Sequence, residues 1–339
     1  MERLGAARVL QLTLRGQRNF LTDHPLVVSF ELTGSCNANC KHCDKGGILP
    51  DETRLPPARI GELYRELRPV AVQLSGGEPL LREDVEDVAR AIKPRGRKCG
   101  APYLILVSNG SLLDVGRYER LRAAGVDQFS LSLDFPDERH DDFRVVPGLF
   151  RHLERLVPRL AAHGHGDVVM NCAVSRLNFD DVTRLAQLAN RWGAAMSYST
   201  YSAMRTGNTD LLVSSPEDLR RLRARVSELV AMKRAGADIR NAIPDLDATY
   251  RFFAEGGIRG CRAGHRFLLV QPDGWMRPCA HQPFRARTHR ALREGFSRTN
   301  ACGGCYVAIR SYCDKSLARL YYDEVLARVP WGEPRAREC

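Results

Sequence analysis

Three cysteines lie close together near the start of the chain. Cys36, Cys40 and Cys43 form a C-x3-C-x2-C motif. Three thiolates on one short segment can hold three irons of a cubane iron–sulfur cluster and leave the fourth iron open, whereas electron-transfer clusters use four cysteines. A zinc site with His42 as fourth ligand is the alternative, but His42 is adjacent to Cys43, which makes chelation by both awkward. The motif therefore favours an open cubane cluster.

A second group of cysteines lies near the end of the chain. The sequence has 11 cysteines, an odd number that argues against a disulfide framework. Spaced cysteines in a cytosolic chain indicate metal ligands or catalytic groups instead. Cys99 and Cys172 lie between the two groups and are expected to be structural. The six that follow residue 260 indicate a second metal-bearing region: Cys261, Cys279, Cys302, Cys305, Cys313 and Cys339.

Strands and helices must alternate around the first motif to position it. Near-continuous apolar strands separated by amphipathic helices indicate a parallel sheet. The pattern predicts six βα units, either closed as a barrel or partial barrel or open as a doubly wound sheet. We expect strands at 27–32, 70–75, 103–107, 128–133, 168–174 and 195–199, and helices at 57–67, 82–92, 117–124, 149–162 and 180–192. A long helix to about residue 235, a poorly patterned connector at 237–258 and a closing helix near 317–326 follow.

Polar and glycine-rich turns follow three of the expected strands. They read Gly76-Gly77-Glu78-Pro79, Ser108-Asn109-Gly110 and Ser132-Leu133-Asp134. Parallel α/β folds bind their ligands at these carboxyl ends of the strands. We therefore expect the first cysteine motif and these turns to form one site.

Taken in order, these motifs resemble the radical S-adenosylmethionine (radical SAM) superfamily. The resemblance implies a partial (β/α)6 parallel barrel with a small C-terminal iron–sulfur domain. It implies that Gly76, Gly77, Glu78 and Pro79 receive the SAM amino group, at a GGE-like motif. Asn109 stands in a segment similar to the usual Thr-Asn-Gly, and Ser132 and Asp134 would contact the ribose and methionine ends of SAM. The segment His140–Arg144, with Pro147-Gly148, continues the resemblance, and Arg144 would pair with the SAM carboxylate.

The C-terminal third is similar to the SPASM and Twitch extensions of that superfamily, which hold auxiliary clusters. Two all-cysteine clusters need eight ligands, and too few cysteines remain for them. The resemblance thus implies one auxiliary [4Fe–4S] cluster, on Cys261, Cys279, Cys302 and Cys305. Cys313 is then a buried thiol and Cys339 a terminal residue, although a second, partial cluster on these two remains an alternative. The implied domains are an N-terminal extension (1–24), the core (25–213), a helical connector (214–260) and the cluster domain (261–339).

The implied activity is reductive cleavage of SAM to a 5′-deoxyadenosyl radical, which abstracts hydrogen from a substrate. The auxiliary cluster would assist a net oxidation or bond formation, and a flavodoxin- or ferredoxin-type donor would supply electrons. Tyr201, Arg205 and His281 are candidates for catalytic roles near the mouth of the sheet. Only about 25 residues precede the first expected strand, fewer than an independently folding recognition domain needs, which weakens a peptide substrate and favours a small molecule. A peptide-modifying maturase is the alternative, and an iron–sulfur electron carrier without SAM chemistry is the alternative from another class.

Net charge and hydropathy argue against a nucleic-acid binder, a membrane protein and a secreted protein. The net charge is +11, but the chain has no block of five consecutive basic residues, so we do not expect a nucleic-acid partner. A zinc-dependent nucleic-acid binder is therefore the weakest alternative. Residues 259–298 hold nine arginines and two acidic residues, which would raise a cluster potential, attract an anionic substrate or form a solvated surface. No apolar run is long enough to span a membrane, and we see no secretory signal, so the expected location is the cytoplasm.

Overall fold

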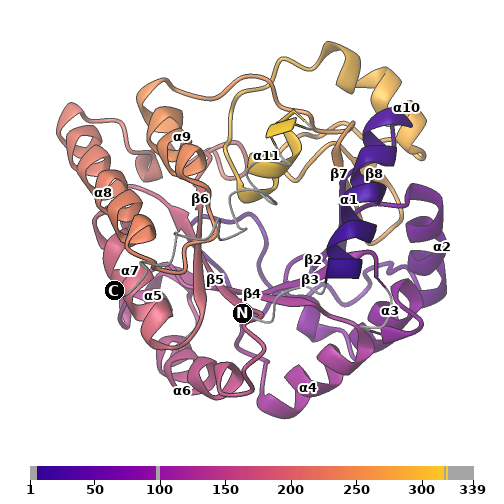
Figure 1. Cartoon of the computed structure of the whole chain (residues 1–339), viewed down its shortest axis with the longest axis horizontal. Coiled ribbons are helices and arrows are strands. Elements are labelled where there is room, and N and C mark those ends of the chain that lie inside the picture. Colours follow the sequence, from indigo (N-terminus) through magenta and orange to yellow (C-terminus); the bar gives the residue numbers. More distant parts are fainter. Residues whose placement is uncertain (1–5, 97–99, 317, 320–339) are drawn as a thin grey trace, which may run out of the picture.

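One eight-stranded sheet forms the centre of the protein (Figure 1). The computed structural model describes residues 6–96, 100–316 and 318–319. Within them the strand order is β6-β5-β4-β3-β2-β1-β7-β8, and every neighbouring pair is parallel except β7 and β8. The strands are β1 (Val27–Glu31), β2 (Ala71–Ser75), β3 (Tyr103–Ser108), β4 (Gln128–Ser132), β5 (Val168–Val174), β6 (Ala195–Thr200), β7 (Phe267–Val270) and β8 (Met276–Arg277). The predicted parallel α/β architecture is confirmed.

Helices follow the strands and cover the outer side of the sheet (Figure 1). They are α2 (Pro57–Leu67), α3 (Val85–Ile92), α4 (Val115–Ala124), α6 (Leu149–Ala161) and α7 (Val182–Arg191). Alternate strand residues such as Val28, Phe30, Val72 and Leu74 are fully buried on this side. Proline begins α2, and the carboxylate of Asp114 caps α4 by accepting from the amide of Arg117.

The other face of the sheet carries short polar side chains. Ser29 and Ser75 hydrogen-bond to each other at 2.7 Å, and the Asn171 amide donates to Ser130 at 2.8 Å. These positions alternate with the apolar ones because successive strand residues point to opposite faces. The inner face therefore offers hydrogen-bonding groups below the strand ends where the cysteine motif lies.

The segment expected only as an N-terminal extension contains a helix, α1 (Ala6–Leu21). It lies beside the amino ends of the strands. Arg8 donates to the carbonyl of Gly100 at 3.1 Å and pairs with Asp127 at 2.6 Å, and Arg15 donates to the Tyr64 hydroxyl at 2.8 Å. Scattered arginines masked its pattern in the sequence, but they are the residues that attach it.

Four further helices follow β6 in the described part of the chain. The predicted long helix is α8 (Pro216–Arg234), and the poorly patterned part of the connector, residues 237–258, contains α9 (Ile243–Ala254). The C-terminal region adds α10 (His289–Gly295) and α11 (Ala308–Cys313). Most of the expected closing helix at 317–326 lies outside the described residues. Short elements are α5 (Arg139–Arg144) and the 3-10 turns at Pro79–Leu81, Phe179–Asp181, Thr209–Leu211 and Ser297–Thr299.

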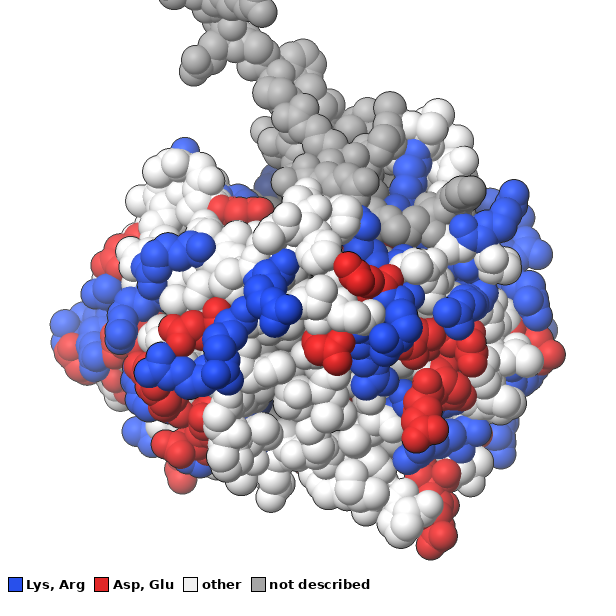
Figure 2. All heavy atoms as spheres, turned by 90° about the horizontal axis from the view of Figure 1, so that it is seen from below, with Lys and Arg blue, Asp and Glu red and all other residues white. Residues whose placement is uncertain are grey.

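The C-terminal region is joined to the main sheet through β7. Val27 to Phe30 of β1 pair in parallel with Phe267 to Val270 of β7. On the face shown in Figure 2, basic and acidic side chains are interleaved rather than separated. No helix among the described residues is long and apolar enough to cross a membrane.

Candidate functional site

The first cysteine motif follows β1 and is held by the carboxyl end of α5. The carbonyls of Phe143 and Arg144 accept hydrogen bonds from the amides of Lys41, at 3.0 Å, and Asn39, at 3.2 Å. Cys36, Cys40 and Cys43 pack together with Ala38 and Val146. The motif is thus fixed between the end of one strand and the end of one helix.

The three thiols lie close enough for their charges to interact. Burial is the main cause that raises the pKa of Cys36 to about 11, and the charges of Glu78, Cys40 and Cys43 contribute to this rise. Such a pocket disfavours free thiolates, and iron bound to the sulfurs would supply the missing positive charge. The donor set therefore fits the three protein ligands of an open cubane cluster.

The neighbouring histidine occupies a different environment. The His42 ring stacks on Phe143, with the ring centres 4.9 Å apart and the planes within 7°. The His42 ring thus packs against the helix that holds the cysteine motif.

Gly76 and Gly77 lie where β2 runs directly against the backbone after β1. A Cβ atom on Gly77 would lie 2.1 Å from the carbonyl oxygen of Ser35, and Gly76 has a φ of +143°. The Gly77 amide donates to Thr33 at 2.8 Å and the Glu78 amide donates to Ser35 at 2.9 Å. Only glycine fits this close approach, so the turn brings the strand edge beside the cysteine motif.

The Glu78 side chain joins the ends of β2 and β3. It is fully buried, and its Oε1 accepts from the Leu80 amide at 3.0 Å and from the Ser108 hydroxyl at 2.8 Å. Its Oε2 accepts from the Asn109 amide at 2.8 Å. Burial raises the pKa of Glu78, while these hydrogen bonds oppose the rise. Both carboxylate oxygens are therefore engaged by the protein itself, and Pro79 begins the short turn that follows.

Asn109 connects β3 to the cysteine motif. Its amide nitrogen donates to Asn37 at 2.9 Å, and its carbonyl oxygen accepts from the amide and the hydroxyl of Ser111. Ser132, at the end of β4, makes a long contact of 3.4 Å with the carbonyl of Ser108. The three polar turns predicted from the sequence thus meet at one end of the sheet.

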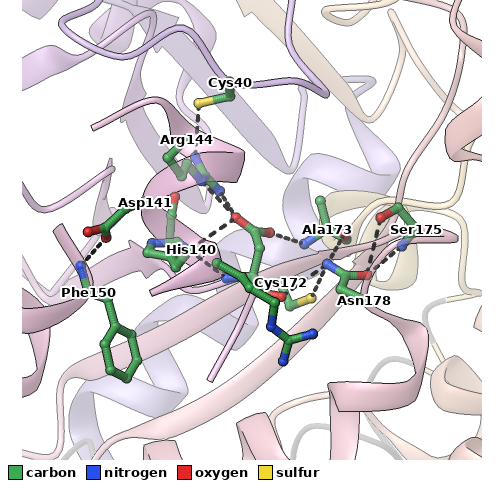
Figure 3. A network of polar contacts seen from close by, with 12 residues as sticks. Cys40, His140, Asp141, Arg144, Phe150, Cys172, Ala173, Ser175 and Asn178 are labelled. Atoms are coloured by element: carbon green, nitrogen blue, oxygen red, sulfur yellow. Dashed lines mark hydrogen bonds and ion pairs between the residues drawn. The ribbon is translucent and has the colours of Figure 1, made fainter. Parts of the chain in front are cut away.

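Asp134 and Arg144 form a buried ion pair beside Cys40 (Figure 3). Nε and Nη2 of Arg144 both lie 2.7 Å from Oδ2 of Asp134, and Nη1 lies 3.7 Å from the Cys40 sulfur. Oδ1 of Asp134 accepts from the Ala173 amide at 3.0 Å. Burial raises the pKa of Asp134, but the Arg144 charge, the two nearby histidines and the hydrogen bond from Ala173 together outweigh burial and hold this pKa below its usual value. The sequence marked both residues but not their pairing.

Two further side chains support this pair (Figure 3). Nδ1 of His140 accepts from the Asp134 amide at 3.1 Å, and burial lowers the pKa of His140 to about 4. The amide of Asn178 donates to the carbonyls of Asp134 and Ala173 and contacts the sulfur of Cys172, which is buried. Asn178 was missed in the sequence because it follows a strand without a recognisable motif.

The second cysteine group also converges in space. Burial raises the pKa of Cys305 to about 12, and the charges of Cys279, Cys261 and Cys302 add to this effect. Asn300 links two of the ligand-bearing loops, because its side chain donates to the carbonyl of Cys261 at 2.8 Å and accepts from the amide of Cys302 at 3.0 Å. Four thiols from three loops are therefore neighbours, which is the donor set that an all-cysteine cubane requires.

One further cysteine lies beside this group in the described part of the chain. Cys313 is fully buried, contacts the carbonyl of Arg266 at 3.8 Å, and packs in the same apolar cluster as Cys261. Cys99 and Cys339 lie outside the described residues.

A buried arginine below the second group was not expected from the sequence. The guanidinium of Arg310 donates to the carbonyls of Cys305 and, at 2.9 Å, Ile258, and pairs with Asp314 at 2.6 Å. It therefore connects the loop before Cys261 to the loop that ends at Cys305. Its partners are mostly backbone carbonyls, which leave no signature in a sequence.

Of the three catalytic candidates, two lie together. Arg205 pairs with Asp44, next to Cys43, and its charge acts on His281. Tyr201 is buried, and its hydroxyl bonds Thr206 and the carbonyl of Asn208, which closes the turn after β6.

Many arginines of the basic segment 259–298 have structural partners. Arg287 and Arg285 lie over the Trp275 ring, at 3.9 and 4.9 Å from its centre. Arg266 lies over Phe20 at 4.1 Å, and Arg293 pairs with Asp23 at 2.6 Å. The last two attach the segment to α1 and to the turn that follows it.

Comparison with known proteins identifies the family. The sequence profile of the radical SAM superfamily matches residues 30–189, which include the first cysteine motif and all three turns. An AdoMet-dependent heme synthase from Methanosarcina barkeri is 30% identical over 89% of this chain and 93% of its own. The chain belongs to the radical SAM superfamily. This radical SAM enzyme uses SAM and a [4Fe–4S] cluster, as its superfamily does.

Other relatives of the radical SAM chain differ in what their names describe. A PqqA peptide cyclase from Granulibacter bethesdensis is 28% identical over 75% of this chain and 67% of its own. SuiB from Streptococcus suis, bound to SAM, shares the fold with a TM-score of 0.61 at 18% identity, over 79% of this chain and 64% of SuiB. SuiB bound to the precursor peptide SuiA gives a TM-score of 0.58 at 15% identity, over 96% of this chain and 71% of SuiB. The fold is therefore shared with an enzyme that binds a peptide.

Proposed function

We propose that this radical SAM enzyme carries two iron–sulfur clusters and oxidises, or forms a bond within, a substrate held between them. Cys36, Cys40 and Cys43 hold the cluster that binds SAM. Cys261, Cys279, Cys302 and Cys305 hold one auxiliary [4Fe–4S] cluster. When bound, the first cluster and SAM supply a 5′-deoxyadenosyl radical that removes a hydrogen atom from the substrate.

The segment after β6 carries this proposal, because it touches both cysteine groups. Arg205 pairs with Asp44, beside Cys43. Three residues earlier, the hydroxyl of Ser202 donates to the carbonyl of Gly304, beside Cys305, at 2.6 Å. A Cβ atom on Gly304 would lie 2.4 Å from the Met204 sulfur. The two cysteine groups therefore flank one short segment at the carboxyl end of the sheet.

The proposed SAM site uses the chain's own groups in two ways. Gly76, Gly77 and Pro79 present a strand edge to the SAM amino group, while Glu78 fixes that edge to β3 through its buried hydrogen bonds. Asn109 and Ser132 line the same end of the sheet. Asp134 orients Arg144, which would pair with the SAM carboxylate beside the cluster.

We favour a small-molecule substrate, with a peptide as the second candidate. The relative at 30% identity is a heme synthase, and the match covers nearly all of both chains. The PqqA peptide cyclase and the peptide-bound SuiB fold support the second candidate. A flavodoxin- or ferredoxin-type protein is the proposed electron donor, and the cytoplasm, where thiols stay reduced, is the proposed location.

Iron content and SAM cleavage test the two-cluster proposal. Anaerobically reconstituted protein should hold about eight irons per chain, as two cubane clusters require. Changing Cys36, Cys40 and Cys43 to Ala should leave about four irons and abolish 5′-deoxyadenosine. Changing Cys302 and Cys305 to Ala should remove the other four irons while SAM cleavage continues in part, because the ligands are separate.

Cys172→Ala is the matched control, since Cys172 is a buried thiol of the core and should leave both readouts unchanged. Cys339→Ala should also retain all the iron; a loss of four irons would show that Cys339 is a ligand. Appreciable 5′-deoxyadenosine from the triple variant would refute the SAM-site assignment.

A further inference from the structure

Arg205 is an incompletely satisfied cation between the two cysteine groups. Its Nη2 pairs with Asp44. Its Nε is buried and has no hydrogen-bond partner among the described residues. Buried N–H groups are nearly always paired in native proteins. An unpaired Nε–H at the carboxyl end of the sheet therefore indicates a missing acceptor.

A second orphaned nitrogen lies beside it. Nδ1 of His281 is buried and has no partner in the described part of the chain. The charges of Arg205, Asp44 and Arg277 all act on His281, so His281 lies near the Arg205–Asp44 pair. His281 comes from the loop after Cys279, and Asp44 comes from the loop after Cys43. Two unpartnered nitrogens from different elements therefore converge where the proposed substrate would lie.

The charges around this point favour a singly charged acceptor. Lys45 is already paired with Glu31 at 3.2 Å, and Glu31 is almost fully buried at the end of β1. Asp44 and Glu31 both lie near Arg205 and would repel a doubly charged phosphate. A carboxylate has a planar pair of oxygens that matches the Nε and Nη2 edge of a guanidinium.

We propose that Arg205 and His281 bind a carboxylate group of the substrate, and that Asp44 is the internal anion that occupies Arg205 when no substrate is present. This rests on the proposed function, because it places the carboxylate between the two clusters. Asp44 is 44% exposed in its side chain, so it can leave the guanidinium for solvent without being buried elsewhere. The substrate class is then a molecule with at least one free carboxylate near the carbon that loses hydrogen.

Succinate, in which each of two separate carboxylates carries a single charge, and its neutral analogue succinamide are suitable probes. Their binding to the reconstituted holoenzyme is measured by calorimetry at constant ionic strength, with inorganic phosphate as a third probe. Wild-type protein should bind succinate and not succinamide. Arg205→Gln should weaken succinate binding at least tenfold, because it removes a charge-assisted hydrogen bond. Asp44→Asn should tighten it several-fold, because the competing anion is gone.

The opposite signs of these two changes separate binding from structural support. If the Arg205–Asp44 pair only held two loops together, both variants would lose succinate affinity to the same extent. That result would overturn the proposal. Arg285→Gln is the matched control, because Arg285 also pairs with a single aspartate, Asp273, away from the site. Equal affinity for succinamide, a preference for phosphate or no succinate binding by wild type would each overturn it as well.

The same samples keep the two proposals apart. Uncoupled formation of 5′-deoxyadenosine and iron content are measured in wild type, Arg205→Gln and Asp44→Asn. If wild type binds succinate but forms no 5′-deoxyadenosine, the proposed function fails and the carboxylate site stands. If 5′-deoxyadenosine forms but succinate binding does not depend on Arg205, only the carboxylate site fails.

Discussion

Arg144 lies between a carboxylate and a sulfur, and this position gives it two tasks. Its ion pair with Asp134 fixes the guanidinium, and its remaining nitrogen points at Cys40 (Figure 3). A fixed cation near a ligand sulfur stabilises the more negative, reduced form of a cluster. The residue that the family resemblance associates with the SAM carboxylate is thus also placed to affect the cluster's potential.

Arg144→Gln should lower the reduction potential of the first cluster on the order of tens of millivolts, because the neutral amide no longer balances the electron that enters. EPR-monitored redox titration of the reconstituted protein measures this directly. Arg139→Gln is the control, since Arg139 belongs to the same helix but pairs with Asp137 at the surface. An unchanged potential in Arg144→Gln would show that the contact with Cys40 has no electronic effect.

At the scale of elements, the strands and most helices could be predicted from the sequence, but the contacts between distant loops could not. Helix α2 and the six core strands follow from apolar periodicity bounded by proline and glycine. Helix α9 was missed because two polar residues, Asp245 and Thr249, lie on its buried face beside apolar residues such as Phe252. Arg310 was missed because it acts through carbonyls of two distant loops.

Arg310→Met should remove about four irons from the reconstituted protein while 5′-deoxyadenosine formation continues, because the loops that carry Cys261 and Cys305 lose their common donor. Arg310→Lys should restore part of the iron, since an ammonium group can reach one carbonyl but not all. Iron analysis and Mössbauer spectroscopy are the measurements. Arg298→Met is the exposed control. Full iron content in Arg310→Met would show that Arg310 is not needed to hold the second cysteine group together.

For the molecule as a whole, α1 attaches the start of the chain to the amino ends of the strands. Its Arg8 shares the buried carboxylate of Asp127 with Lys93, whose side chain is fully buried and lies 2.8 Å away. The carboxylate also accepts from the Leu104 amide at 2.8 Å, at the beginning of the β3 pairing. This end of the sheet stabilises the fold, and the other end holds the chemistry.

Arg8→Gln should reduce the free energy of unfolding by about 1–3 kcal/mol, because one of two cations on a buried carboxylate is lost. SAM cleavage at 25 °C should not change, since the substitution lies at the opposite end of the strands. Denaturant unfolding followed by circular dichroism gives the stability. Arg18→Gln on the exposed side of the same helix should have no effect, and an equal loss there would point to helix propensity instead of the ion pair.

The pairing of β1 with β7 fixes how far apart the two cysteine groups lie. The first cysteine motif begins shortly after β1, and β7 lies between Cys261 and Cys279, so both cysteine groups depend on the same row of hydrogen bonds from Val27 to Phe30. If the second group holds the proposed cluster, the distance that an electron must cross is set by the register of these two strands and by the lengths of the turns that follow them.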